Sequence, residues 1–249
     1  MLELYRWEPN ANSLKVMICL LEKGLKFNDH YVDILEFEQY ARAFLELNPA
    51  GQVPVLVHEG EALAESTLIC EFLEEAFPKT RLSPSTPRGW YELQAWGKFV
   101  DYNLAPSVST LGWHMVMAPL VPQRDVQDIP VPERRAAWQS AFTGGGGEEQ
   151  LSDSRRKVEL ALDRIENMLA ASGWLMGTAY SLADIEAFSM AATLTRLLPD
   201  LANPQRYPRV ADWLGRIEAR GAVAEALSMR RSELAPDLYA PGPEHSRWG

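Results

Sequence analysis

The sequence predicts an α/β N-terminal domain over residues 1–80 and an all-α C-terminal domain over residues 88–249. Three observations support this division. Residues 1–80 alternate short strand-like runs with helical ones, and their 14 acidic and six basic residues carry most of the net charge of −10. The segment 78–88, PKTRLSPSTPR, has three prolines separated by Ser and Thr, which is typical of a linker. Beyond it, the apolar residues recur at helical spacing.

The N-terminal domain is expected to follow the order βαβα and then ββα. Alternation of apolar and polar residues predicts strands at Leu2–Trp7, Phe27–Val32, Val55–Val57 and Ala62–Ala64. Apolar residues at helical spacing predict one helix that ends at Gly24, a second at Phe37–Leu47, and a third whose apolar stripe runs from Leu68 to Phe77.

The C-terminal domain is expected to contain five helices separated by glycine or proline. They are predicted at about 88–117, 151–171, 181–197, 208–219 and 222–232. Between the first two, residues 119–149 contain four prolines and a glycine run at 144–147, and are expected to be irregular. A connection of this length is usually functional or disordered.

Composition limits the classes of function. A hydrophobic fraction of 47% with 23% charged residues is ordinary for a soluble globular protein, and the acidic balance disfavours a nucleic-acid partner. The N-terminus lacks the apolar region of a signal peptide, and no apolar run is long enough to predict a membrane span. Cys19 and Cys70 lie in no metal-ligand pattern. We therefore expect a cytoplasmic protein with neither a metal nor a membrane partner.

Gln52-Val53-Pro54, just before a predicted strand, has two interpretations. Proline here can be an edge residue that donates no ladder hydrogen bond. Alternatively, the peptide bond before Pro54 is cis, and the Val53 backbone then faces an extended, peptide-like ligand. Eleven residues after Pro54, Glu65-Ser66 begins a predicted helix. The Ser66 hydroxyl and the free N–H groups of that helix can hold a carboxylate, while Glu65 can receive an ammonium group.

Three motifs together resemble the glutathione transferases, and the resemblance covers nearly the whole chain. They are Gly51-Gln52-Val53-Pro54, Glu65-Ser66, and the capping box Ser181-Leu182-Ala183-Asp184. The resemblance implies a thioredoxin-like N-terminal domain that binds glutathione as co-substrate and a helical domain that forms the hydrophobic substrate site. It also implies a homodimer.

By that resemblance, Glu65 and Ser66 bind the γ-glutamyl end of glutathione, and Val53 with Pro54 binds the cysteinyl backbone. Gln39 and Gln52 are candidates for the glycyl end. The thiolate-stabilising group of the family lies at the start of the first helix, where the sequence offers Ser13 first and Asn12 second. A helix N-terminus and a hydroxyl donor both lower the pKa of a thiol. Ser13 can also be an ordinary helix cap, and the two roles are compatible.

Further stretches resemble one branch, the bacterial glutathione-dependent β-etherases. They include Ala11–Lys15, Phe37–Gln39, Ser109–Trp113 and Ile129–Glu133. In that branch, glutathione thiolate displaces a phenol from the carbon next to an aryl ketone of lignin-derived compounds. The products are a glutathione thioether and a phenol. The aromatic substrate is expected to contact residues around the first long helix and the irregular segment, namely Tyr102, Trp113, His114, Met117, Trp138 and Phe142. Taken singly, each of these residues is better interpreted as an ordinary core or surface residue; it is their concentration beside the irregular segment that suggests a substrate site.

Two alternatives remain open. The first is a general serine-type glutathione transferase that acts as a dehalogenase or isomerase; such enzymes often use an extra cysteine near the thiolate, and residues 8–13 contain none. The second is a non-catalytic ligand-binding protein of the same fold, which the presence of Ser13, Val53, Glu65 and Ser66 disfavours.

Overall fold

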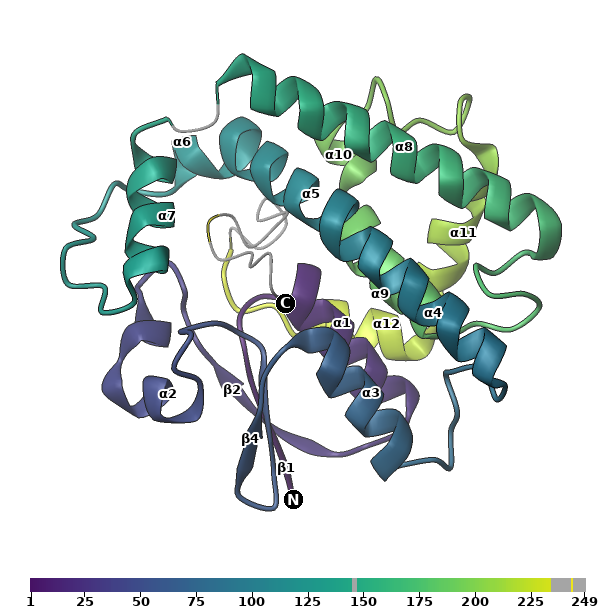
Figure 1. Ribbon diagram of the computed structural model, residues 1–249, viewed down its shortest axis with the longest axis horizontal. Helices are drawn as coiled ribbons and strands as arrows, with labels where there is room; N and C mark the ends of the chain where they lie inside the picture. Colours follow the sequence, from purple (N-terminus) through teal and green to yellow (C-terminus); the bar gives the residue numbers. More distant parts are fainter. Residues whose placement is uncertain (145–146, 234–242, 244–249) are drawn as a thin grey trace.

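The computed structural model describes residues 1–144, 147–233 and 243. A four-stranded mixed sheet forms the N-terminal part and helices form the rest, as predicted (Figure 1). The strand order is β2-β1-β3-β4, with β1 parallel to β2 and antiparallel to β3, and β3 antiparallel to β4. The strands are β1 (Leu2–Arg6), β2 (Phe27–Tyr31), β3 (Val55–His58) and β4 (Glu61–Leu63).

Helices cover both faces of this sheet. Leu2, Leu4 and Leu56 pack toward helices α1 (Ala11–Glu22) and α3 (Ser66–Ala76). Val55 and Val57 point to the opposite face because side chains alternate along a strand, and they pack against helix α2 (Arg42–Leu47). The predicted helix at 37–47 is therefore wrong in part. A short 3₁₀ turn, η1 (Glu38–Tyr40), precedes α2, and extended backbone at Ala41 separates the two.

The first long helix of the C-terminal part is a continuous helical path from residue 87 to residue 120. It consists of α4 (Pro87–Phe99), the π-helical turn η2 (Val100–Leu104), α5 (Ala105–Gly112), the π-helical turn η3 (Trp113–Met117) and α6 (Ala118–Leu120). Each π turn lies just before a proline, Pro106 or Pro119. Proline has no N–H to donate and its ring crowds the preceding turn, so a wider turn continues the helix where a regular one would break.

The segment 119–149, predicted to be irregular, contains helix α7 (Pro132–Phe142), which corrects that prediction. Pro132 occupies the first turn of α7, where its fixed φ favours a helix rather than ending one. Two glycines of the predicted run, 145 and 146, lie outside the described residues. The remaining helices are α8 (Glu148–Ser172), α9 (Leu182–Ala191), α10 (Leu194–Leu197), α11 (Pro208–Glu218) and α12 (Gly221–Ser228).

The sheet and the C-terminal helices share one hydrophobic core. Helix α1 packs against α3 of its own domain and against α9 and α12 of the other. At the start of α9 the predicted capping box is present, and Ser181 N donates to Asp184 Oδ2 at 3.0 Å. Between α3 and α4, the buried Glu74 carboxylate accepts hydrogen bonds from Leu82 N and Ser83 N. The placement of a domain boundary at 78–88 stays a prediction.

Glu186 of α9 is buried in this core against Gly97 of α4. A Cβ at residue 97 would lie 3.2 Å from Glu186 Oε2, so glycine leaves room for the carboxyl group. Oε2 has no hydrogen-bond partner within the described part of the chain. Burial raises the pKa of Glu186 to about 7, and the Lys15 ammonium opposes part of that rise.

We expect Glu186 to make stability depend on pH. Its pKa is about 7 in the folded protein and 4.5 as an ordinary glutamate. The folded state then binds the proton more tightly, so the free energy of unfolding falls as pH rises from 4.5 to 7, by about 3 kcal/mol in total. In the Glu186→Gln variant, the free energy of unfolding should not show this fall with rising pH. Urea unfolding at mildly acidic and at alkaline pH measures it, with the exposed Glu75→Gln as control. Equal pH dependence in the Glu186→Gln variant and the parent would contradict this assignment.

Candidate active site

The N-terminus of α1 carries both residues predicted to stabilise the thiolate. Asn12 and Ser13 lie in its first turn, directly after the loop that leaves β1. Trp7 N donates a hydrogen bond to Ser13 Oγ at 3.3 Å. This contact uses Ser13 Oγ as an acceptor, and no residue in the described part of the chain accepts its hydroxyl hydrogen. Ser13 can therefore donate to a ligand at this helix end.

A hydrogen bond joins the N-termini of α1 and α3. Ser66, the first residue of α3, donates from Oγ to Asn12 Oδ1 at 3.2 Å. The N-terminus of a helix has unpaired N–H groups and a partial positive charge. Two such ends meet here, in a domain whose charged side chains are mainly acidic. The arrangement can hold a carboxylate at α3 and an anionic sulfur at α1.

Glu65 precedes α3 in an unusual backbone conformation, with φ of 70°. Few residues other than glycine adopt this region, and such conformations concentrate at functional sites. Burial raises the pKa of the Glu65 carboxyl, while the charges of Arg134 and Lys15 oppose the rise. Lys15 is itself 1% exposed and donates to Thr67 Oγ1 at 3.0 Å. Glu65 is thus a half-buried carboxyl group that can receive an ammonium group.

The Val53–Pro54 peptide bond is cis, in agreement with the second interpretation of this motif. Asn48 Nδ2 donates to Gln52 O at 2.9 Å and holds the turn before β3. Gly51 has φ of +62°, and a Cβ there would lie 2.7 Å from Tyr40 Cε1. Only glycine therefore fits at this position. Val53 and the Gln52 side chain are half-buried next to this turn.

Gln39 is not an exposed glutamine. Its side chain is fully buried, and Nε2 donates to Ile34 O at 3.2 Å. The amide therefore supports the loop between β2 and α2 from inside. The expected contact between Gln39 and the glycyl end of a ligand stays a prediction.

The aromatic residues predicted to contact the substrate separate into two groups. Trp113, Met117 and Trp138 are at most 3% exposed. They belong to a buried set that we call the interdomain aromatic cluster, which comprises Trp7, Ile34, Tyr40, Trp113, Met117, Val121, Val126, Ile129 and Trp138. Within it, Trp138 Nε1 donates to Tyr40 OH at 3.2 Å. Met117 and Trp138 are therefore core residues that hold α7 and η3 against the N-terminal domain. Their contact with an aromatic substrate stays a prediction.

Tyr102 and Phe142 lie outside that buried set. Tyr102 is 60% exposed in η2, with the Lys98 ammonium 5.9 Å from its ring centre. Its contact with an aromatic substrate also stays a prediction. Phe142 is half-buried at the end of α7, with its ring centre 5.8 Å from that of Trp113.

A cavity of about 150 Å³ lies between α5, η3 and α7, and Gln150 of α8 and Pro243 also line it. Its lining includes the predicted residues Trp113 and His114. Ser109, Thr110, Ser140 and Gln150 also line this cavity and were not among the residues predicted from the sequence. Thr110 lies three residues before Trp113, so both share one helix face, and this spacing was the signal available in the sequence. An indole surface with hydroxyl and amide groups suits an aromatic ligand that carries oxygen atoms.

Neither a metal centre nor a membrane span can be built from the described residues. Residues 1–144, 147–233 and 243 contain no group of three or more His, Cys, Asp or Glu side chains placed to bind a metal ion. No helix within these ranges is long and apolar enough to cross a membrane.

Comparison with known proteins assigns the family. Residues 11–76 match the glutathione S-transferase N-terminal domain, and residues 101–221 match the glutathione S-transferase C-terminal domain. These two segments make up more than half of the chain. The chain belongs to the glutathione S-transferase family.

This glutathione S-transferase is similar to several known proteins, both in sequence and in structure. Protein LigF of Sphingobium sp. strain SYK-6 is 37% identical over 245 residues, which cover 93% of this chain and 95% of LigF. The crystal structure of the β-etherase LigF superposes with a TM-score of 0.85 and covers 91% of this chain and 98% of that chain. Maleylacetoacetate isomerase of Pseudomonas aeruginosa is 39% identical over 215 residues, which cover 85% of this chain and 90% of the isomerase.

Truncating one buried and one exposed aromatic residue tests which of the two side chains stabilises the core. Trp138→Ala removes a buried indole and is expected to lower the free energy of unfolding by about 3–5 kcal/mol. Tyr102→Ala removes an exposed ring and is expected to change it by less than about 0.5 kcal/mol. Urea unfolding of both variants measures the difference. A small effect at Trp138 would mean that the interdomain aromatic cluster is loosely packed.

Proposed function

We propose that the protein is a glutathione-dependent β-etherase. The observation that carries this proposal is the meeting of two helix N-termini, with Ser13 on α1 and Ser66 on α3 joined through Asn12. This arrangement suits a ligand that has a carboxylate at one point and an ionisable sulfur at another. The similarity to the β-etherase LigF over nearly the whole chain supports the particular reaction.

In this proposal, glutathione binds along the N-terminal domain. Its γ-glutamyl carboxylate accepts hydrogen bonds from the Ser66 hydroxyl and from N–H groups at the start of α3, and its ammonium group faces Glu65. The cysteinyl backbone pairs with the Val53 backbone next to the cis proline, and Gln52 is placed toward the glycyl end. The sulfur then lies at the start of α1, where Ser13 Oγ–H donates to it. These contacts lower the pKa of the thiol and leave a thiolate at neutral pH.

The reaction is a substitution at carbon. The thiolate sulfur attacks the carbon that bears the aryloxy group, next to the ketone of the substrate. The new C–S bond forms as the C–O bond breaks, with inversion at the carbon. The electron pair leaves on the phenolate oxygen, which then takes a proton from water. No oxidant or reductant is needed, and much of the rate comes from holding the two reactants in line.

The aromatic part of the substrate is assigned to the cavity between α5, η3 and α7. Trp113 offers an indole surface there, and Phe142 packs edge-on beside it. His114 and Thr110 border the same cavity and can hydrogen-bond to substrate oxygen atoms. Lignin-derived aryl ketones have this combination of rings and oxygen atoms, which supports a role in lignin degradation.

An isomerase is the second candidate, because the maleylacetoacetate isomerase relative is 39% identical. The same thiolate would add to an unsaturated substrate and leave again without net transfer. The loop before Ser13 has no cysteine, and Cys19 and Cys70 are free but buried. A β-etherase needs only the glutathione thiolate and an aromatic cavity, so this interpretation is favoured.

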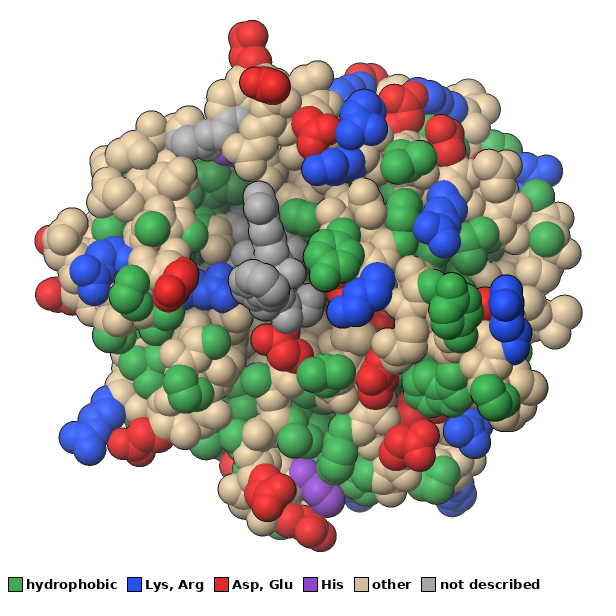
Figure 2. Space-filling view, in the orientation of Figure 1, with side chains coloured by type: hydrophobic (Ala, Val, Ile, Leu, Met, Phe, Trp, Pro, Cys, Tyr) green, Lys and Arg blue, Asp and Glu red, His purple; other side chains and the backbone are tan. Residues whose placement is uncertain are grey.

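The proposal includes a homodimer in the cytoplasm. Exposed apolar side chains gather over α3 and α4 on the face seen in Figure 2. Leu68 of α3 is 59% exposed and Tyr91 of α4 is 64% exposed. A second copy of the chain would cover these side chains. The reduced state of both cysteines and the use of glutathione fit a reducing compartment.

The assay of the proposal is phenol release. The protein mixed with glutathione and each enantiomer of an α-keto β-aryl ether is expected to release the phenol and form the thioether. Ser13→Ala loses one hydrogen bond to a charged sulfur and is expected to slow release by about 10- to 100-fold. Rates are followed by chromatography of both products.

Unfolding curves of Ser13→Ala and the parent are the control, since the variant should remain folded. No phenol from either enantiomer would reject the etherase, and turnover of maleylacetoacetate in its place would select the isomerase. A Ser13→Ala variant as fast as the parent would transfer the thiolate-stabilising role to Asn12 or to a backbone amide.

The homodimer is tested by sedimentation. The parent is expected at twice its chain mass of 28.0 kDa, and Leu68→Glu at 28.0 kDa, because a charge would be buried without a partner. Leu160→Glu on α8, at a residue that is also exposed, should leave the parent mass unchanged. A monomeric parent would reject this arrangement.

A further inference from the structure

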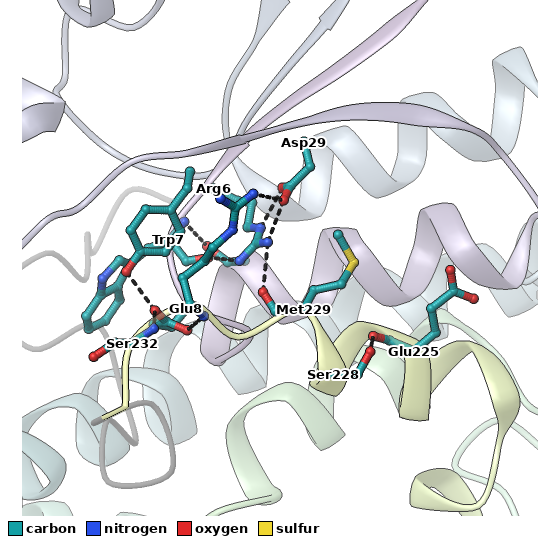
Figure 3. Close-up of polar contacts among 11 residues, drawn as sticks. Arg6, Trp7, Glu8, Asp29, Glu225, Ser228, Met229 and Ser232 are labelled. Atoms are coloured by element: carbon teal, nitrogen blue, oxygen red, sulfur yellow. Dashed lines mark hydrogen bonds and ion pairs between the residues drawn. The ribbon is translucent and has the colours of Figure 1, made fainter.

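A buried carboxylate lies in the loop between β1 and α1, four residues before Asn12. Glu8 is fully buried and accepts hydrogen bonds from Tyr31 OH at 2.6 Å, Arg231 N at 3.0 Å and Ser232 N at 2.7 Å. A buried carboxylate is costly unless donors of this kind surround it. Glu8 therefore binds the backbone that follows α12, and Figure 3 shows Ser232 beside it.

Arg6, at the end of β1, binds the same C-terminal segment. Its guanidinium is fully buried and pairs with both oxygens of Asp29, at 2.7 and 2.6 Å. It also donates to Met229 O and to Trp7 O, each at 2.9 Å. Such a planar, two-point ion pair fixes orientation as well as charge. We call the contacts of Arg6 and Glu8 with Met229, Arg231 and Ser232 the C-terminal clamp.

Trp7 lies between the two charged residues of the C-terminal clamp. Its carbonyl accepts from Arg6, and its N–H donates to Ser13 Oγ at 3.3 Å. Its indole ring is buried in the interdomain aromatic cluster. Hydrogen bonds therefore hold the Trp7 backbone at both its carbonyl and its N–H group. The position of the Trp7 N–H also determines which lone pair of Ser13 Oγ accepts a hydrogen bond. The direction left for the Ser13 hydroxyl hydrogen depends on this contact.

Tyr31 keeps the C-terminal clamp closed on the side of Glu8. Two guanidinium groups contact its ring, with the Cζ atoms of Arg6 and Arg231 each 5.8 Å from the ring centre. Burial and the hydrogen bond to Glu8 raise the pKa of Tyr31 above its ordinary value. Its hydroxyl group therefore stays protonated and donates to Glu8 over the whole working pH range.

We propose that Arg6 and Glu8 are positioning residues for the thiolate-stabilising serine. By holding the Trp7 backbone to the segment Met229–Ser232, they direct the Ser13 hydroxyl hydrogen toward the glutathione sulfur. This inference rests on the proposed function, because it concerns the same serine. The C-terminal segment thereby becomes a structural part of a site built mainly from the N-terminal domain.

The test replaces Glu8 by glutamine in the full-length protein. Glutamine keeps one acceptor oxygen, but its NH₂ group opposes a backbone N–H, so the contacts with Arg231 and Ser232 weaken. The pKa of bound glutathione, read from the ultraviolet absorbance of its thiolate during a pH titration, is expected to rise by about one unit, a tenfold loss of thiolate. The kcat at neutral pH should fall while the KM for glutathione stays close to that of the parent.

Glu22→Gln is the matched control. Glu22 pairs with Arg220 at 2.5 Å and also joins the N-terminal domain to the helix α12 region, but through the far end of α1. The Glu22→Gln variant should be less stable than the parent, while the pKa of bound glutathione should stay the same. A purely structural role of the C-terminal clamp would give the same result for both variants, and that result would overturn the inference.

Two further measurements keep the outcome decisive. Hydrogen exchange at the Arg231 and Ser232 amides should quicken in Glu8→Gln; faster exchange with an unchanged thiol pKa would overturn the inference. Tyr31→Phe removes a single hydrogen bond to Glu8. If Glu8→Gln fails to fold, this variant tests for the same rise in the pKa of bound glutathione, with a smaller expected size. If the parent itself leaves the pKa of bound glutathione unshifted, the proposed function fails. If the parent lowers that pKa and both variants match it, only the positioning role fails.

Discussion

The burial of α1 is the constraint on which the rest of the structure depends. This helix packs against α3 inside its own domain and against α9 and α12 from the other. From Ala11 to Leu20, only Asn12 is not fully buried. A helix enclosed in this way cannot shift without opening the core of both domains. Its first turn is therefore a rigid base for Asn12 and Ser13, and the hydrogen bond from Ser66 sets the start of α3 at a fixed place beside it.

Buried polar contacts, and not only apolar packing, fix how the two domains meet. Lys23 of α1 pairs with the buried Glu74 of α3, and Glu74 holds the chain that leads into α4. Arg6 and Glu8 connect the end of β1 with residues beyond α12, more than 200 positions later. Such contacts are directional, so they specify one relative placement where an apolar surface alone would tolerate several.

Local motifs made the glutathione-binding half predictable. Val53-Pro54, Glu65-Ser66 and the start of α1 each depend on a few neighbouring residues, so their spacing already indicates backbone geometry. The aromatic half was less predictable, because nothing in the sequence says whether Tyr102 or Trp138 faces inward. Helix α7 was missed since Pro132 resembles a helix breaker unless its place in the first turn is known. Gln39, Arg6 and Glu8 are polar residues that usually face water, and only tertiary contacts explain their burial.

The π turns of the helical path from residue 87 to residue 120 bear on how this protein can change over evolution. Each π turn accommodates one additional residue without ending the helix. One added residue rotates every later side chain by about 100° around the helix axis. Trp113 lines its cavity because the π turn η2, which precedes it along the helix, sets the rotation of the residues that follow. Insertions and deletions in this stretch would therefore change which residues line the cavity, whereas substitutions alter only the chemistry of that lining. Drift in chain length here is a route to new specificity that leaves the glutathione half untouched.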